Sequence, residues 1–218
     1  MSIKEKRLHQ TLFLLSMVVF VWSYVGHYDT FAWSMLSLPI VLMLAYAVIT
    51  YPRFQFTSIA YIMLLIYVIV LWIGAKYTYN MNPWFDIIQE TFDHSRNHYD
   101  RVGHFFMGFV PIFFIKEYLL RKNHFKRSFF FYLVMFLMIL GIAATWELLE
   151  FLATIISDRP ADYMLAAQGD IWDTHWDILY APIGAAVYFV TLSRLHDRQM
   201  EKKMSLDKKK RDGGHGLT

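Results

Sequence analysis

The stretch SFFFYLVMFLMILGIAATWELLEFL, residues 128–152, decides the fold class. No charged residue occurs in it before Glu147, and its apolar residues run without the spacing of an amphipathic helix. A helix rises about 1.5 Å per residue, so about 20 residues cross a hydrocarbon core of ~30 Å. The stretch therefore predicts a transmembrane helix that is surrounded largely by lipid.

Five further apolar runs accompany it: 12–25, 31–49, 59–75, 102–120 and 176–195. The first follows Lys4, Lys6 and Arg7, but no small-residue cleavage site comes after it. We interpret it as a retained anchor rather than a signal peptide. Hydrophobic residues make up 56% of the chain and charged residues only 18%, against about 25% charged in soluble domains. We predict an all-α, polytopic membrane bundle of about six transmembrane helices over residues 1–195.

The basic residues predict the orientation of these spans in the membrane. With six spans, sixteen Lys and Arg residues fall on the side of the two termini, and four fall on the other side, namely Lys76, Arg96, Arg101 and Arg159. Cytoplasmic loops carry the excess of basic residues in membrane proteins. We therefore expect both termini to be cytoplasmic. Residues 196–218 are expected to form a basic, disordered cytoplasmic tail.

The composition excludes several kinds of function. The chain has no Cys, so disulfides, thiolate metal sites and Cys nucleophiles are excluded, and His, Asp and Glu are left as the strong metal ligands. The net charge of +3 comes from residues that flank the spans, so we expect no nucleic-acid partner. The lipid bilayer is the one partner that the composition requires, and the oligomeric state is left open.

The acidic residues gather on the side opposite to the basic ones. Of 18 Asp and Glu residues, 12 fall on the outer side, although carboxylates contribute little to topology. Six of these twelve lie in three segments: YDRVGHF at 99–105, WELLEF at 146–151 and GDIWDTHWD at 169–177. Each segment stands at the outer end of a predicted span, so we expect all three to meet at one depth in the membrane.

Helical spacing places the polar side chains of each segment on one face. Asp100 and His104 are four residues apart, and Glu147 and Glu150 are three apart, which is the spacing of neighbours on a helix surface. In the third segment Asp170, Asp173 and Asp177 share a face. Carboxylates within a span cost about 2.5 to 3.5 kcal/mol each and usually face the bundle interior or a wet cavity.

We predict that these residues form a polar site that binds a cation, because neighbouring glutamates repel one another unless protonated or bridged. The predicted metal ligands are His104, Glu147, Glu150, Asp173 and Asp177, for a divalent ion such as Zn, Mn, Fe or Mg. We expect His104, Glu147 and Asp177 to approach within roughly 7 Å. Two simpler interpretations stay open: Asp170 or Asp173 caps the last span, and His94 and His98 are solvated loop residues.

The order of the three motifs resembles the YjdF-like inner-membrane proteins, a family without an established function, over about residues 10 to 195. The chain is more remotely similar to VanZ-like membrane proteins. Asp100, His104, Glu147, Asp177 and Gly184 fit positions of that pattern, whereas Ala181 and Glu150 depart from it. The first resemblance implies a multi-pass protein of the bacterial inner membrane. The second implies that the chain shares a polar site with VanZ-like proteins, which are linked to the cell envelope.

Three functions fit these observations. In the first, the site catalyses metal-assisted hydrolysis or transfer on an envelope lipid or glycan intermediate, with Glu147, His104 and Asp177 as catalytic residues and Arg101 binding an anionic substrate. The second is a small proton-coupled transporter. Against it, we expect no polar group in the inner half of spans four to six. The third is a non-catalytic membrane protein that binds or senses a ligand.

Overall fold

The computed structural model describes residues 2–122, 124–157 and 168–214, which form helices and loops without a strand. Three charged residues that the sequence analysis assigned to the outer side, Asp158, Arg159 and Asp162, lie outside these ranges. The helical content confirms the predicted all-α fold of a polytopic membrane protein.

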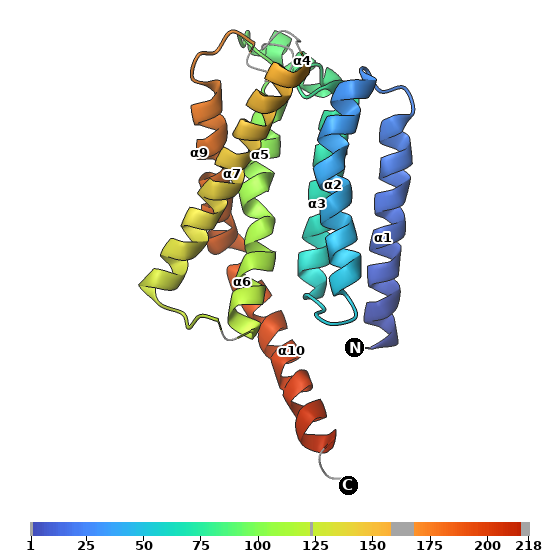
Figure 1. The fold of residues 1–218 in the computed structure, drawn as a ribbon, viewed down its shortest axis with the longest axis vertical. Helices are drawn as coiled ribbons and strands as arrows, with labels where there is room; N and C mark the ends of the chain where they lie inside the picture. The colour runs from blue at the N-terminus through green and yellow to red at the C-terminus, as the bar shows by residue number, and fades with distance from the viewer. Residues whose placement is uncertain (1, 123, 158–167, 215–218) are drawn as a thin grey trace.

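The first three helices, α1 (Ile3–Tyr24), α2 (Thr30–Thr50) and α3 (Ser58–Tyr77), lie side by side (Figure 1). α1 begins with a capping box, in which the Ser2 hydroxyl accepts the Glu5 N–H at 3.2 Å and the Glu5 carboxylate accepts the Ser2 N–H at 2.8 Å. Both bonds satisfy helix N–H groups that otherwise lack a partner. α1 and α2 each pack against α3, so α3 is the central helix of this half.

The second half contains the short α4 (Pro83–Thr91), followed by α5 (Tyr99–Phe109), α6 (Pro111–Arg121), α7 (Phe129–Ser157), α9 (Asp173–Thr191) and α10 (Ser193–Gly214). α5 and α6 continue one another along the bundle (Figure 1). The break between them falls at Pro111. Proline has no backbone N–H, so it cannot form the hydrogen bond that would continue α5 through this position. α5 packs against α9, α9 also packs against α7, and α3 joins this half through α5.

Among the described residues, four helical segments are long and apolar enough to cross a membrane: α2, α3, α5 with α6, and α7. The pair α9 and α10 is bent by 69° and counts as a fifth if it forms one span. α1, with 22 residues, is long enough but is not among these segments, and its first turns carry the polar residues Arg7, His9 and Gln10. The structure therefore supports four or five spans, and a sixth formed by residues 12–25 stays a prediction.

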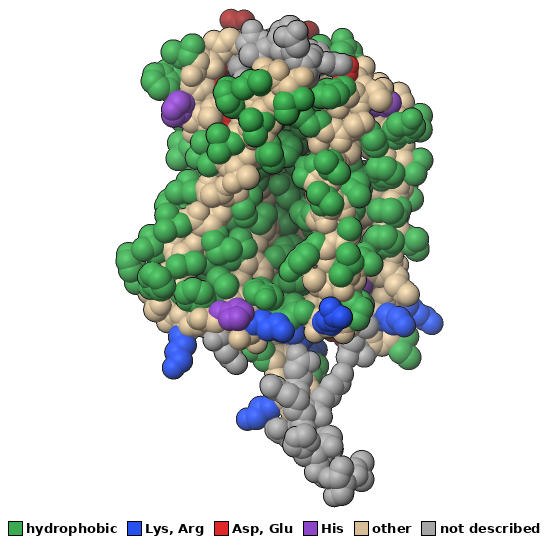
Figure 2. All heavy atoms as spheres, viewed as in Figure 1, with side chains coloured by type: hydrophobic (Ala, Val, Ile, Leu, Met, Phe, Trp, Pro, Cys, Tyr) green, Lys and Arg blue, Asp and Glu red, His purple; other side chains and the backbone are tan. Residues whose placement is uncertain are grey.

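Charged side chains of opposite sign gather at opposite ends of the bundle. The end where both chain termini lie carries Lys and Arg, and we call it the basic end (Figures 1 and 2). The end beside α4, where Asp and Glu are visible, is the acidic end (Figure 2). Hydrophobic side chains cover the surface between the two ends (Figure 2), including exposed Leu14 and Val18 on α1 and Leu38 and Leu42 on α2. This band is the surface that lipid covers.

Residues 196–214 are helical, whereas we expected a disordered tail over residues 196–218. Helix α10 runs from Ser193 to Gly214, and its first turns are anchored in the bundle. His196 and Met200 are buried, and the Gln199 side chain accepts the backbone N–H of Ile59 at 3.2 Å. The basic composition led us to expect disorder, but buried residues on one side of the helix provide the packing that orders it.

Glycines allow α5 and α9 to approach closely. A Cβ atom on Gly108 would lie 1.7 Å from the carbonyl oxygen of Ala181, and one on Gly184 would lie 2.0 Å from that of Phe105. Gly108 and Gly184 are therefore positions of direct contact between the two helices. The close crossing of α5 and α9 brings the polar residues of the two helices together.

Candidate functional site

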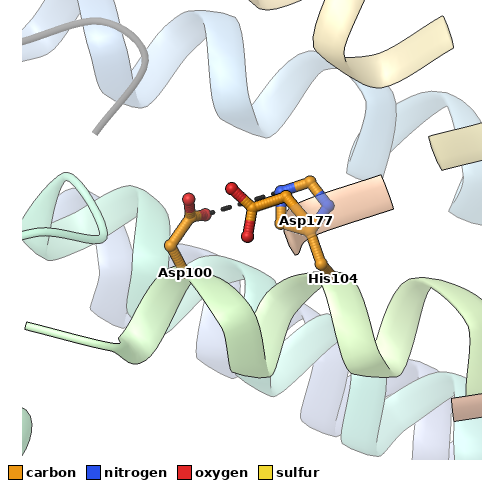
Figure 3. Close-up of side chains that lie close together, drawn as sticks. All are labelled: Asp100, His104 and Asp177. Atoms are coloured by element: carbon orange, nitrogen blue, oxygen red, sulfur yellow. Dashed lines mark ion pairs between the residues drawn. The ribbon is translucent and has the colours of Figure 1, made fainter. Parts of the chain in front are cut away.

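Asp100 and His104 on α5 meet Asp177 on α9 near the acidic end of the bundle (Figure 3). Each offers one ligand atom, and these atoms lie within 4.8 Å of one another. The His104 Nε2 atom lies 3.7 Å from the Asp100 Oδ1 atom. All three residues are buried. Together they form the centre of the candidate site.

α7 adds two glutamates to this centre. Glu147 is buried, and its Oε1 atom lies 3.4 Å from the His104 Nε2 atom. Glu150 is also buried and interacts electrostatically with Asp100, Glu147 and Asp177. The structure therefore places His104 near both Glu147 and Asp177, within the separation that the sequence analysis expected. It also adds Asp100, which was not among the predicted metal ligands.

Several polar atoms of the centre are buried without a hydrogen-bond partner. They are His104 Nδ1, Glu147 Oε1 and Asp177 Oδ1. A buried polar atom without a partner lowers the folding stability by about 1 to 3 kcal/mol. Such atoms are rare in native proteins, so these three indicate a site for a ligand. In a tetrahedral site with bonds of 2.0–2.2 Å, two ligand atoms lie about 3.3 to 3.6 Å apart. The three ligand atoms, which lie within 4.8 Å of one another, therefore have to move inward by up to about 1 Å to hold a divalent ion.

Asp173, another predicted metal ligand, has a different partner. Its carboxylate pairs with the guanidinium of Arg96, and both side chains are buried. The sequence analysis recorded Arg96 only as an outer basic residue and did not expect this pair, since 77 residues separate the two positions. Asp173 is therefore engaged by Arg96 beside the centre rather than within it, and the predicted capping role for Asp173 is replaced by this ion pair.

Arg101, the predicted substrate-binding residue, lies beside the centre. Its guanidinium donates to the Asp170 carboxylate at 3.0 Å. Asp170 also accepts the backbone N–H of Trp172 at 3.0 Å, just before α9 begins. Asp170 thus forms a turn just before α9 and orients Arg101. The N-cap residue of α9 is Trp172, and no side chain of the described residues caps this helix, so the predicted capping role of Asp170 is not seen. The rings of His94 and His98 pack against each other, with centroids 5.2 Å apart. Neither histidine belongs to the group of possible metal ligands formed by Asp100, His104 and Asp177.

A cleft of about 490 Å³ leads to the centre from the side of the bundle. Its walls are mainly apolar and come from α2, α3, α5 and α7, including Leu36, Met43, Met138 and Leu149. Asp100 and His104 also line it. Figure 2 shows the surface hollowed between α2 and α7. The cleft therefore joins the polar centre to the surface that faces lipid.

The structure also contains a polar cluster at the basic end that the sequence analysis missed. Glu117 on α6 is fully buried. Its carboxylate accepts from the Thr57 N–H at 3.0 Å, from the Thr57 hydroxyl at 2.9 Å and from Arg121. The His196 Nε2 atom lies 3.1 Å from the same carboxylate, and the His196 Nδ1 atom lies 2.8 Å from the Tyr188 hydroxyl.

The expectation that the inner halves of spans four to six lack polar groups is therefore wrong. The signal was present, because Lys116 and Glu117 interrupt the apolar run 102–120. The structure buries both side chains. Their partners His196 and Asp197 belong to the segment that we expected to be disordered, so sequence spacing gave no reason to join them.

Comparison with known proteins agrees with the membrane fold. Residues 8–198 match the model of a family described as "Predicted membrane protein (DUF2238)". The chain is 31% identical over 185 residues to the inner membrane protein YjdF of Escherichia coli (strain K12), covering 85% of this chain and 88% of that protein. No solved structure matches. These matches confirm the resemblance to YjdF-like proteins, and the similarity to VanZ-like proteins stays a prediction. The chain belongs to the DUF2238 family of membrane proteins.

Proposed function

We propose that the protein is a membrane enzyme that uses a divalent metal ion to hydrolyse or transfer a group on an envelope lipid. The observation that carries this proposal is the cleft of about 490 Å³, which is apolar along most of its length and ends at Asp100 and His104. Ligand sites are typically apolar pockets with a few convergent polar groups. An opening toward the lipid-facing surface suits a substrate that has an apolar tail and a polar head.

The residues of the centre have distinct roles in this proposal. Asp100, His104 and Asp177 are the ligands for the ion, since their ligand atoms lie within 4.8 Å of one another. A bound ion would polarise the substrate and lower the pKa of a water molecule. Glu147, beside His104 at 3.4 Å, is the general base that takes the proton from that water. Glu150 adds negative charge that favours a cation.

Metal analysis and lipid analysis of the purified protein test this proposal. After exposure to Zn or Mn and removal of free metal, we expect about one ion per chain in the parent and a large loss in His104→Gln. The metal-loaded parent, incubated with a polar lipid extract from bacterial membranes, should deplete one lipid class measured by mass spectrometry. Ser205→Ala, a change of an exposed residue on α10, is the matched control and should behave like the parent.

If no divalent metal binds to the parent, the proposal is wrong. If metal binds through His104 but no lipid class changes, the enzymatic function is wrong, and the protein is a binding or sensing protein instead. Both results are informative because metal content is measured separately from turnover.

We further propose that the chain lies in the bacterial inner membrane with both termini in the cytoplasm. The inner-membrane location is supported by its relative, the inner membrane protein YjdF. The orientation rests on the basic residues at the end where the termini lie (Figure 2). In this orientation the centre faces the outer side of the membrane, where envelope lipids and glycan intermediates are processed.

Cysteine labelling tests the orientation, because the chain has no native Cys. Asp93→Cys lies at the acidic end and Glu201→Cys on α10, and both positions are exposed. In sealed spheroplasts a membrane-impermeant maleimide should label Asp93→Cys and leave Glu201→Cys unlabelled until the membrane is opened. The reverse pattern would place the centre on the cytoplasmic side and contradict the proposed orientation.

A proton-coupled transporter is the second candidate, and the buried cluster of Glu117 and His196 favours it. Titratable groups near both ends of the bundle are typical of proton-coupled carriers. Between the two clusters, however, Gly108 and Gly184 bring α5 and α9 into direct backbone contact, which leaves no room for a polar path at that crossing. Uptake of protons into vesicles that contain the parent, lost in Glu117→Gln, would favour the transporter.

A further inference from the structure

A second cavity, of about 480 Å³, lies at the acidic end, beside the centre formed by Asp100, His104 and Asp177. Unlike the apolar cleft, it is lined by polar residues, chiefly Arg96, His98, Arg101, Gln168 and Asp170, with Trp176. Within the part of the chain that the structure describes, these residues come from the loop before α5, from α5 itself, from the loop before α9 and, for Trp176, from α9. The cavity thus gathers two arginines and a histidine in one place.

Arg101 is held in a fixed orientation at this cavity. Its guanidinium donates to Asp170 at 3.0 Å, and it lies 5.8 Å from the Trp176 ring centroid and 5.9 Å from that of Tyr180. The Asp170 contact uses one terminal nitrogen. The Nε atom of Arg101 is buried and has no hydrogen-bond partner. A guanidinium has five N–H donors in a planar fork, so Arg101 keeps a donor for a ligand.

His98 gives a second, independent indication of a ligand. Its Nδ1 atom is also buried without a hydrogen-bond partner, and its side chain lines the same cavity as Arg101. Buried nitrogen atoms usually find a partner in native proteins. Two such atoms in one polar cavity indicate that an acceptor with several oxygen atoms belongs there.

Hydrogen bonds between the two loops keep the cavity in shape. The Gln168 side chain accepts the Asn97 N–H at 2.9 Å and donates to the Asn97 carbonyl at 2.9 Å. Arg96 pairs with Asp173 on α9. The loop before α5 is therefore tied to the loop before α9 and to α9 itself, and a ligand would meet a preorganised set of donors.

We propose that this cavity recognises a phosphoryl group, carried by the headgroup of the lipid on which the centre acts. A phosphate offers several acceptor oxygens to the Arg101 fork and to His98, and arginine is the residue that suits phosphate geometry best. Asp100 of the centre and Arg101 of the cavity are consecutive residues on α5, so a phosphoryl group bound here lies beside the metal ligands. This inference rests on the proposed function and names its substrate class.

Isothermal titration of chelated, metal-free protein in a phosphate-free detergent tests the inference. The probes are inorganic phosphate, dioctanoyl phosphatidic acid and dioctanoylglycerol, which has the same tails without the phosphoryl group. We expect phosphatidic acid to bind at least about 10-fold more tightly than dioctanoylglycerol, since a single hydrogen bond to a charged group contributes at least about that factor. Arg101→Gln should remove this preference, whereas Arg53→Gln at the basic end removes the same charge and should keep it.

Two further comparisons make the result decisive. If inorganic phosphate binds as tightly as phosphatidic acid, the cavity recognises free phosphate and the lipid part of the proposal is overturned. If dioctanoylglycerol and phosphatidic acid bind equally, or Arg101→Gln changes nothing, the whole inference is overturned. Should Arg101→Gln fail to fold, Arg101→Lys and His98→Ala take its place, and each should weaken phosphatidic acid binding while leaving dioctanoylglycerol binding unchanged.

The failure of this inference is distinguishable from that of the proposed function. Phosphatidic acid binding is measured here without metal, and metal content is measured without lipid. Metal binding without a phosphoryl preference overturns only the inference. A phosphoryl preference without metal binding supports the cavity and overturns the metal-dependent reaction.

Discussion

Asp177→Asn should leave the metal-free protein at least as stable as the parent and should abolish its response to metal. Asp177 interacts electrostatically with Asp100, Asp173 and Glu147, and its Oδ1 atom is buried without a partner. Neutralising one member of a repelling group removes an unfavourable interaction, which we expect to stabilise the empty protein by about 1 to 2 kcal/mol. A protein of this size changes its melting temperature by roughly 2 to 4 °C per kcal/mol.

The metal response should change in the opposite direction. In the parent, a divalent ion should raise the melting temperature, because it binds the folded state only. Loss of one ligand should weaken metal affinity by more than the roughly 10- to 100-fold that changes around a metal site cause. A thermal scan in detergent, with chelator and then with excess Zn or Mn, measures both effects.

Asp170→Asn is the matched control for this experiment. It loses its pair with Arg101, which is partly exposed and contributes about 0.2 to 1 kcal/mol, but it should keep the metal response. An Asp177→Asn protein that melts well below the parent in chelator, together with a parent that ignores metal, would contradict the cation site. Asp177 would then be a structural residue.

Glu117→Ala should destabilise the protein strongly, and far more than Asp170→Asn. Glu117 is fully buried, and its carboxylate is bonded to Thr57, Arg121 and His196. Its removal takes this acceptor away from the Thr57 N–H, the Thr57 hydroxyl and the His196 ring, and it takes the opposite charge away from Arg121. Breaking a buried charged network in this way costs about 3 to 5 kcal/mol, so we expect the melting temperature to fall by roughly 6 to 20 °C.

The matched control is Glu201→Ala, which removes an exposed carboxylate from α10 and should shift melting by no more than about 1 to 2 °C. Metal affinity should be unchanged in Glu117→Ala protein that remains folded, because Glu117 and the centre lie near opposite ends of the bundle. A melting temperature within a degree or two of the parent would mean that the network contributes no net stability. The anchoring of α10 would then depend on Met200 and its apolar neighbours.

The fold class and the faces of the individual helices follow from the amino-acid sequence alone. Apolar runs such as 128–152 decide that the chain is helical and lies in a membrane, because backbone groups in lipid must be satisfied within the segment. Helical spacing alone placed Asp100 beside His104, and it put Glu147 on the same face as Glu150. These are local properties, and they need no knowledge of which helices are neighbours.

Only the tertiary structure decided which of these residues share a site. The close crossing at Gly108 and Gly184 brings Asp177 to Asp100 and His104, and no spacing rule relates positions so far apart in the chain. The same holds for Arg96, which pairs with Asp173, and for Glu117, which meets His196 across 79 residues. Helix faces follow from the 3.6-residue period of one segment. Which helices are neighbours follows from packing, because small residues on one helix allow another helix to approach closely. The neighbouring helix then supplies the partners of the polar groups between the two.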